Sequence, residues 1–378
     1  MKILFLFWSL WFLNFSTRTV LSPLLPVFEK DLSISHALAG TTFLFLALGY
    51  TSSLLAAGWL TPRVGFKRSI ALGFGILTGT LPCLPFISSY WHLGFVALFL
   101  GLGGGIYIPC ALPLLTSTIS PEKWGKSIAF HETAASFSIL AIPLLAAAAM
   151  QIVGWPALIL TLSALCLVAT TVFVFRAPDP RPEREQHSPF SRVLRRRDFW
   201  VISALWGFAA AGSVGLYNLI PLFLVNEKGL SIEMADTIFG FSRIGGLLVM
   251  FLAGFLIDKI GVKRVLLLSL LASGFGTTGI ALADAFPLLV AMLVLQATFM
   301  PIFFTAGLVA ITKLTDFTDR SAFAGATVAV GVIFGTGLAP TLLGLVADAR
   351  NFETGIFIQG MLTMAVSLLL PLLRKIQQ

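Results

Sequence analysis

Apolar residues run along this chain in long blocks that short polar stretches separate. Cutting the sequence at its charged residues and at its Pro, Gly and Asn turns leaves twelve blocks of about 20 residues or more. A block of this length predicts a helix that crosses a bilayer, because about 20 apolar residues span the hydrocarbon core. The predicted spans are residues 3–28, 38–60, 69–87, 93–116, 125–150, 156–175, 199–225, 235–257, 265–283, 286–311, 322–346 and 352–373.

The two ends of the first half need separate interpretation. The N-terminus reads MKILFLFWSLWFLNF, a basic start and apolar core that also fit a secretory signal. No small-x-small cleavage site follows and the apolar run continues to Phe28, so we interpret it as the first span. The stretch RAPDPRPEREQHSPFSRVLRRRD is rich in proline and charge. It predicts an N-terminal bundle over 1–176, a cytoplasmic linker over 177–198 and a C-terminal bundle over 199–378.

The two halves match each other at an offset of 196 to 198 residues. LSPLLPVFEKDLSI, which begins at Leu21, aligns with LIPLFLVNEKGLSI, which begins at Leu219. GWLTPRVGFKR, from Gly58, aligns with GFLIDKIGVKR, from Gly254, and a third match joins the fifth and eleventh blocks. Matches in order at a nearly constant offset predict two pseudo-symmetric six-helix bundles. The fold class is therefore an all-α polytopic membrane protein, with a repeat typical of secondary transporters.

Composition identifies lipid as the solvent for most of the surface. Hydrophobic residues make up 57% of the chain and charged residues 11%, against about 25% charged residues in soluble domains. Too few polar residues are present to cover two or three soluble globules. The three cysteines are far apart and inside apolar runs, so we expect neither disulfides nor a metal site.

The net charge of +8 follows the predicted topology. With a cytoplasmic N-terminus, 20 of the 25 Lys and Arg residues fall on the cytoplasmic side and three outside, while the acidic residues divide eight and eight. The basic excess thus indicates orientation, and we expect no nucleic-acid partner. We expect a monomeric multi-pass protein of a prokaryotic inner membrane, with both termini cytoplasmic.

A glycine-rich motif follows the second and eighth blocks. With the twelve spans and the basic central loop, this G-x-x-x-D-[RK]-x-G-x-[RK]-[RK] pattern makes the whole chain resemble the major facilitator superfamily. The resemblance implies alternating access between two bundles, no cofactor and a cytoplasmic gate. In the first copy Pro62 stands where the pattern has Asp, so only Asp258 is expected to make an acidic contact, near Gly125. The implied gate residues are Gly58, Arg63, Gly65, Arg68, Gly254, Asp258, Gly261 and Arg264.

Away from the span ends, four ionisable residues fall deep inside the predicted spans: Arg18, Arg243, His131 and Glu132. An Arg at mid-bilayer costs about 2.5–3.5 kcal/mol, so a charge retained there usually faces a watery cavity or a partner. Two guanidiniums predict an anion, since each offers a planar fork for carboxylate or phosphate oxygens. Asn14 precedes Arg18 by four residues and shares its helix face. Structural ion pairing is the alternative.

Weaker candidates complete the site. Glu132 is the expected proton carrier, with His131 beside it; a structural role is the alternative for both. Tyr107 and Asn218 fall in helices that line the cavity in the resembling family, so both are candidate solute ligands. Interhelical hydrogen bonds would explain them equally well.

The resulting hypothesis is a secondary transporter of a small anionic solute, an organic acid, with proton symport. No G-x-x-x-x-G-K-[ST] loop is present, so gradients have to drive uphill transport. No nucleophile motif or His/Cys/carboxylate cluster indicates an enzyme. An arginine in the eighth predicted span, here Arg243, is similar to the arrangement in the superfamily's monocarboxylate and oxalate transporters. The first alternative is a proton-coupled efflux antiporter for drugs or amphiphiles, and the second a transporter-like sensor that does not cycle.

Overall fold

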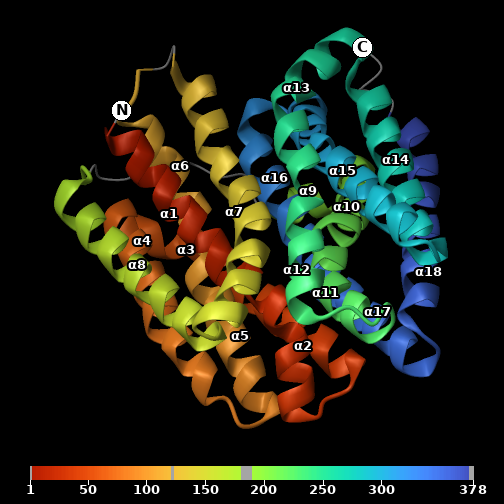
Figure 1. The fold of residues 1–378 in the computed structure, drawn as a ribbon. Helices are drawn as coiled ribbons and strands as arrows, with labels where there is room; N and C mark the ends of the chain where they lie inside the picture. The colour runs from red at the N-terminus through yellow and green to blue at the C-terminus, as the bar shows by residue number, and fades with distance from the viewer. Residues whose placement is uncertain (1, 121–122, 180–189, 374–378) are drawn as a thin grey trace. The chain divides into compact units, whose positions relative to one another are not determined.

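A computed structural model describes residues 2–120, 123–179 and 190–373 of the chain, and these residues form helices and connecting turns without a strand (Figure 1). Within them, 11 helical segments are long and apolar enough to cross a membrane, and a bent pair over Ile232–Met250 and Leu252–Ile260 raises the number to 12. Each of these segments overlaps one of the twelve predicted blocks. The prediction of an all-α polytopic membrane protein is confirmed.

Several spans are interrupted, either at a glycine or proline of the sequence or by a π-helical turn of the backbone. The first half of the chain contains α1 (Lys2–Thr19), α2 (Leu21–Leu32), α3 (His36–Val64), α4 (Phe66–Thr80), η1 (Leu81–Phe86), α5 (Tyr90–Gly105), α6 (Tyr107–Thr116), α7 (Trp124–Ile152) and α8 (Trp155–Arg176). The second half contains α9 (Phe190–Leu194), α10 (Arg197–Ala210), η3 (Ala211–Gly215), α11 (Leu216–Asn226), α12 (Ile232–Phe241), α13 (Ile244–Ile260), α14 (Val262–Leu282), α15 (Phe286–Leu314), α16 (Phe317–Gly331), η4 (Val332–Leu338), α17 (Ala339–Ala349), α18 (Phe352–Ala365) and η5 (Val366–Leu372).

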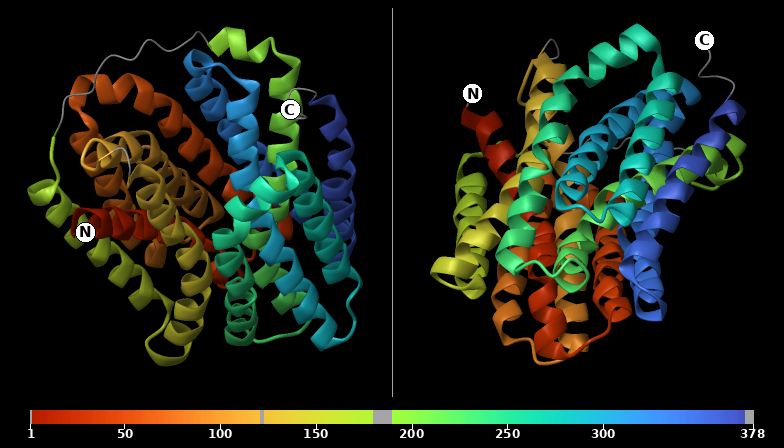
Figure 2. Two further views of the ribbon diagram at one scale, coloured as in Figure 1. Left: turned by 90° about the horizontal axis from the view of Figure 1, so that it is seen from above. Right: turned by 45° about the vertical axis from the view of Figure 1, so that its right-hand side comes forward.

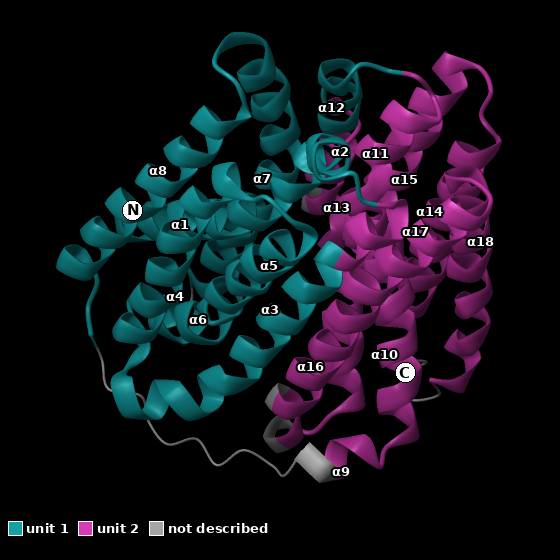
Figure 3. Cartoon of the chain, turned by 90° about the horizontal axis from the view of Figure 1, so that it is seen from below, with its two compact units in different colours: residues 1–34, 42–184, 230–240 teal, residues 35–41, 185–229, 241–378 magenta. Residues whose placement is uncertain are grey.

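The chain forms two compact units, shown in two colours in Figure 3. Unit 1 contains residues 1–34, 42–184 and 230–240, and unit 2 contains residues 35–41, 185–229 and 241–378. Unit 1 thus includes α12 except for its last residue, Phe241, and unit 2 includes the first turn of α3. The division at the linker stays a prediction, and residues 180–189 of that linker lie outside the described residues.

Each unit has its own set of tightly packed helices. In unit 1, α1 packs against α7 and α8, and α4 packs against α5 and α8. In unit 2, α14 packs against α15 and α18, which run beside it in Figure 2. The most deeply buried rings include Phe7 and Phe173 in unit 1 and Phe199 and Phe303 in unit 2. Large apolar side chains such as Phe175, which is 81% exposed, cover the outside, as expected for a surface in contact with lipid.

The repeated motif adopts the same backbone in both copies. Gly65 has φ 91° and ψ 158°, and Gly261 has φ 86° and ψ 149°. A residue with a Cβ is strained in this region, so the turn between consecutive spans requires glycine. This shared conformation supports the repeat that the sequence predicts.

Candidate functional site

Arg18 lies in the last turn of α1, next to the break between α1 and α2. Its Nη2 donates to Asn14 Oδ1 at 3.3 Å, and its Nε donates to the Asn14 backbone carbonyl at 3.4 Å. Asn14 is fully buried, and its Nδ2 donates to the carbonyl of Gly104 on α5 at 3.2 Å. Because Gly104 holds the amide nitrogen, the amide oxygen faces Arg18. Asn14 therefore sets the direction of the guanidinium.

Aromatic rings and a glycine surround this guanidinium. The ring centres of Phe15 and Tyr50 each lie 4.6 Å from Arg18 Cζ, and that of Trp11 lies 5.9 Å away. A Cβ added at Gly104 would stand 3.1 Å from Arg18 Cδ, so this glycine makes room for the side chain. Cation–aromatic contacts stabilise a guanidinium without cancelling its charge.

The Arg18 cluster has unused hydrogen-bond donors. Two of the five N–H groups of the guanidinium bond to Asn14, which leaves three. Trp11 Nε1 is buried and has no hydrogen-bond partner among the described residues. Over the same residues, Arg18 forms no ion pair with a carboxylate. A positive charge with spare donors in an apolar setting is complementary to an anion.

A second cluster joins α6 and α7 through hydrogen bonds. The Tyr107 hydroxyl donates to the Phe7 carbonyl at 2.8 Å and lies 3.1 Å from His131 Nε2. His131 Nδ1 lies 3.0 Å from Glu132 Oε1. The His131 side chain is fully buried, whereas that of Glu132 is 39% exposed. Adjacent helical residues point about 100° apart, and the burial of these two side chains does differ, but they bond to each other.

Counting hydrogens leaves two protonation forms for this pair. Tyr107 uses its one hydrogen on the Phe7 carbonyl, so His131 Nε2 has to donate to the hydroxyl. The contact between His131 Nδ1 and Glu132 then needs one further proton, whether imidazolium faces carboxylate or neutral imidazole faces carboxylic acid. In either form the pair is neutral and holds one transferable proton. Without that proton, the lone pair of His131 Nδ1 would face the Glu132 carboxylate, and the hydrogen bond between them would be lost.

Trp11 connects the two clusters. Its ring stacks on Tyr107 with centres 5.3 Å apart and on His131 with centres 5.7 Å apart, while the same ring lies under Arg18. The structure therefore brings five of the predicted site residues into one region of unit 1. These residues are Asn14, Arg18, Tyr107, His131 and Glu132.

Arg243 belongs to unit 2 and lies at the break between α12 and α13. It is 8% exposed, and its Nη1 donates to Gln296 Oε1 at 3.3 Å. Gln296 Nε2 in turn donates to the carbonyl of Gly212, in the π-helical turn η3. The ring centre of Tyr217 lies 5.4 Å from Arg243 Cζ. Arg243 thus contacts α15 and α11 of its unit directly, and is connected to η3 through Gln296.

The other predicted residues remain candidates. Asn218 is 3% exposed, and its Nδ2 has no hydrogen-bond partner among the described residues. Of the predicted gate, Arg63 is exposed and donates to the Trp59 carbonyl at 2.6 Å. Asp258 is exposed as well, and forms no ion pair within the described residues. The gate therefore stays a prediction.

Sequence reasoning missed several residues of these clusters. Trp11 and Phe15 stand seven and three residues before Arg18, a helical spacing that could have placed them on its face. Tyr50 comes from α3, and no local signal connects it with Arg18. The charge count assigned Asp236 to the outer side of the membrane without noting burial, and the structure buries its side chain completely. Its position beside Ala235 in an apolar run was the available signal.

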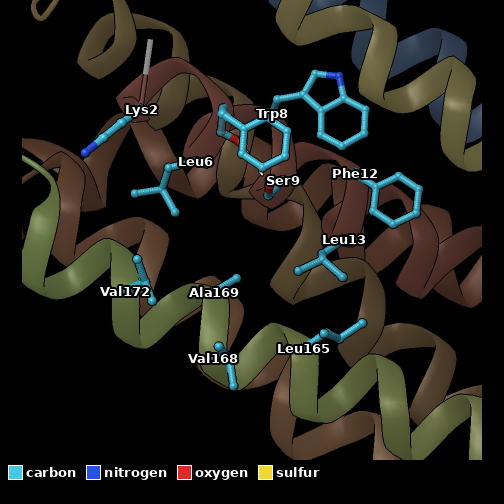
Figure 4. A pocket seen from close by; sticks show the side chains of 11 residues that line it. Lys2, Leu6, Trp8, Ser9, Phe12, Leu13, Leu165, Val168, Ala169 and Val172 are labelled. Atoms are coloured by element: carbon cyan, nitrogen blue, oxygen red, sulfur yellow. Dashed lines mark hydrogen bonds between the residues drawn. The ribbon is translucent and has the colours of Figure 1, made fainter.

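An apolar groove of about 430 Å³ runs between α1 and α8 on unit 1 (Figure 4). None of the predicted solute or proton residues lines it. Its surface suits a lipid acyl chain rather than an ion. The lining residues are Lys2, Phe5, Leu6, Trp8, Ser9, Phe12, Leu13, Leu165, Val168, Ala169 and Val172.

Comparison with known proteins places this arrangement in a family. The family model of the Major Facilitator Superfamily matches residues 7–254 and 218–377. A solved structure of a bacterial homolog to the human lysosomal transporter Spinster, inward-facing and unoccupied, has a TM-score of 0.83 with this chain. It is 15% identical and covers 100% of this chain and 97% of its own, so it shows the fold.

Sequence relatives carry the names of transporters for different solutes. The cis,cis-muconate transport protein of Acinetobacter baylyi is 24% identical over 381 residues, which cover 95% of this chain and 91% of that protein. The probable nitrate/nitrite transporter NarK2 of Mycobacterium tuberculosis is 28% identical over 289 residues, 72% of this chain and 69% of that protein. Other relatives are named as sugar and amine transporters, so relatedness alone does not fix the solute.

Proposed function

Because this chain belongs to the major facilitator superfamily, and is thus a multi-pass membrane transporter rather than an enzyme, we propose that its solute is a small anion, an organic acid, which moves together with protons. The observation that carries the proposal is the Arg18 cluster. Its guanidinium keeps three N–H groups and forms no ion pair in the described chain. Arg243 and Asn218 are proposed as further ligands.

The chemistry around Arg18 suits a carboxylate attached to an apolar body. The guanidinium fork matches two carboxylate oxygens, and the buried Trp11 Nε1 offers one more donor. The rings of Phe15 and Tyr50 present apolar surface next to the charge. A charge-assisted hydrogen bond contributes about 1.5–3 kcal/mol, so Arg18 accounts for a large share of the affinity.

The proposed proton carrier is the His131–Glu132 pair. The partly exposed Glu132 exchanges the proton with water. The buried His131 contacts Tyr107 and Trp11, so a change in the protonation of the pair alters the contacts of these two side chains. Moving an anion inward against an inside-negative potential costs about 2.3 kcal/mol per charge per 100 mV. A proton carried with the anion cancels that charge. Symport is therefore the proposed coupling.

Uptake by proteoliposomes tests the solute class. Purified protein is reconstituted and assayed with labelled nitrate, acetate, benzoate, succinate and cis,cis-muconate, and with the lipophilic cation tetraphenylphosphonium. We expect uptake of at least one organic anion, lost in Arg18→Ala and kept in Arg350→Ala, which removes an exposed arginine. Transport of the cation alone, unchanged in Arg18→Ala, would contradict the proposal and favour efflux antiport.

An imposed pH gradient tests the coupling. Wild-type protein is expected to accumulate the anion when the outside is acidic. Glu132→Gln keeps the shape of the acid but cannot ionise, so accumulation should fall while exchange of labelled for unlabelled anion continues. Accumulation that persists in Glu132→Gln would remove the pair from the mechanism.

A further inference from the structure

Asp236 is a buried acid that the proposed mechanism does not use. It is the fifth residue of α12, and none of its surface is exposed. Neither carboxylate oxygen has a hydrogen-bond partner among the described residues. Gly240, one turn later on the same face, packs against Leu140 and Leu144 of α7 within unit 1. The carboxyl group therefore lies on a helix face that packs on apolar side chains.

The charges near Asp236 do not compensate a carboxylate. Glu233, one turn earlier on α12, is itself negative, and no ion pair involves Asp236 in the described chain. Leu140 and Leu144, which face α12 from α7, do not titrate. A bare carboxylate is strongly disfavoured in such surroundings, whereas the neutral acid is tolerated. Asp319, which is also buried, differs because it lies 4.0 Å from Arg196.

Asp236 and the His131–Glu132 pair lie toward opposite ends of α7. Glu132 is near the start of α7, and Leu144, the contact of Gly240, is 12 residues further along. At 1.5 Å per residue this separation is about 18 Å. Asp236 itself is four residues, about 6 Å, from the start of α12. One turn of helix thus separates its carboxyl from the end of the span.

We propose that Asp236 is a second proton-binding site of this transporter. It holds a proton while α12 is packed as in this structure, and exchanges it with water at the end of the membrane where α12 begins. The His131–Glu132 pair exchanges its proton toward the other end. Each transport cycle then carries two protons. The stoichiometry rests on the proposed function, whereas the protonation of Asp236 does not.

Infrared spectroscopy tests the site without any solute. Protein labelled with [13C]aspartate is placed in lipid nanodiscs at about pH 7. We expect a carbonyl band of a protonated carboxylic acid that shifts with the label, moves on transfer from H2O to D2O, persists in Glu132→Gln and is absent from Asp236→Asn. The absence of a label-sensitive acid band, or a band that does not respond to D2O, would overturn the proposal. If Asp236→Asn does not fold, the labelled wild type alone decides, because Asp319 is ion-paired.

Accumulation tests the second proton separately. In proteoliposomes at zero membrane potential, a pH gradient of one unit supports about tenfold accumulation for each coupled proton. We expect wild-type accumulation of the transported anion to exceed that of Asp236→Asn about tenfold, while anion exchange stays within about twofold. Equal accumulation would show that Asp236 carries no coupled proton. Loss of uptake in Arg18→Ala remains a separate result, so either proposal can fail alone.

Discussion

The Arg18 cluster of unit 1 and the Arg243 cluster of unit 2 use the same device in different ways. In both, an amide oxygen accepts from the guanidinium and the amide nitrogen donates to a glycine carbonyl. Asn14 is on the same helix as Arg18, whereas Gln296 reaches Arg243 from α15. Asn14 therefore orients the Arg18 side chain, whereas Gln296 connects segments of unit 2 that are far apart in the sequence.

Burial and context extend this difference. Arg18 is half-buried between aromatic rings, while Arg243 is 8% exposed. A guanidinium that one neighbour orients is suited to binding, because three of its N–H groups stay without a hydrogen-bond partner among the described residues. A guanidinium at a junction of segments contributes to holding those segments together. The comparison predicts that changes around Arg18 mainly weaken anion binding, and that changes around Arg243 weaken the fold in addition to any effect on binding.

The largest expected effect is on anion binding. Arg18→Ala removes charge-assisted hydrogen bonds worth about 1.5–3 kcal/mol, so affinity should fall about 10- to 150-fold. Arg18→Lys keeps the charge but loses the planar fork, so its affinity should lie between that of the wild type and that of Arg18→Ala. The measurement is the shift of thermal unfolding with cis,cis-muconate or nitrate concentration. Equal stabilisation of wild type and Arg18→Ala would contradict the assignment.

Stability separates the two amides. Gln296→Leu leaves a buried guanidinium and the Gly212 carbonyl short of a partner, which should lower the free energy of unfolding by about 1–3 kcal/mol. Asn14→Leu should cost less, about 0.5–1.5 kcal/mol, because Arg18 is half-buried and keeps the Asn14 backbone carbonyl. Denaturation in mixed micelles measures both. A larger loss of unfolding free energy in Asn14→Leu than in Gln296→Leu would contradict the comparison.

Two glycines give the smallest and most selective test. A Cβ at Gly104 would stand 3.1 Å from Arg18 Cδ and 3.2 Å from its Nε, so Gly104→Ala should displace the guanidinium. We expect a loss of affinity of up to about tenfold, since overpacking costs of order 1 kcal/mol. A Cβ at Gly212 would stand 3.3 Å from the flexible end of Met300. Gly212→Ala should therefore leave binding unchanged, and an equal loss in both variants would exclude the steric explanation.

The repeat shows what could be predicted from the sequence. The spans, their order and the glycine turns at Gly65 and Gly261 follow from hydrophobic length and from matched motifs, because both depend on local residues. At the repeat offset, Arg18 corresponds to the region of Gly215, and Arg243 to that of Leu46. The two arginines are therefore not part of the repeat. The sequence indicates them only as charged residues inside apolar runs.

The partners of these charges depend on packing between helices, which periodicity does not determine. Asn14 was found because it lies one turn from Arg18. Tyr50 and Gln296 come from other helices, and their contacts appear only in the folded chain. Asp236 was missed because it lies close to a predicted span end and was counted with the acidic residues of the outer side. The hydrogen bond between His131 and Glu132 was likewise hidden by the rule that adjacent helical residues diverge.

The central claim is that an anion at Arg18 and a proton on the His131–Glu132 pair bind together in unit 1. Titration calorimetry of the transported anion, in two buffers that differ in heat of ionisation, measures the protons taken up per anion bound. We predict that proton uptake accompanies anion binding, because the nearby negative charge favours the protonated pair. We predict none in Glu132→Gln. Binding without linked protons at any pH, or unchanged affinity in Arg18→Ala, would contradict the account.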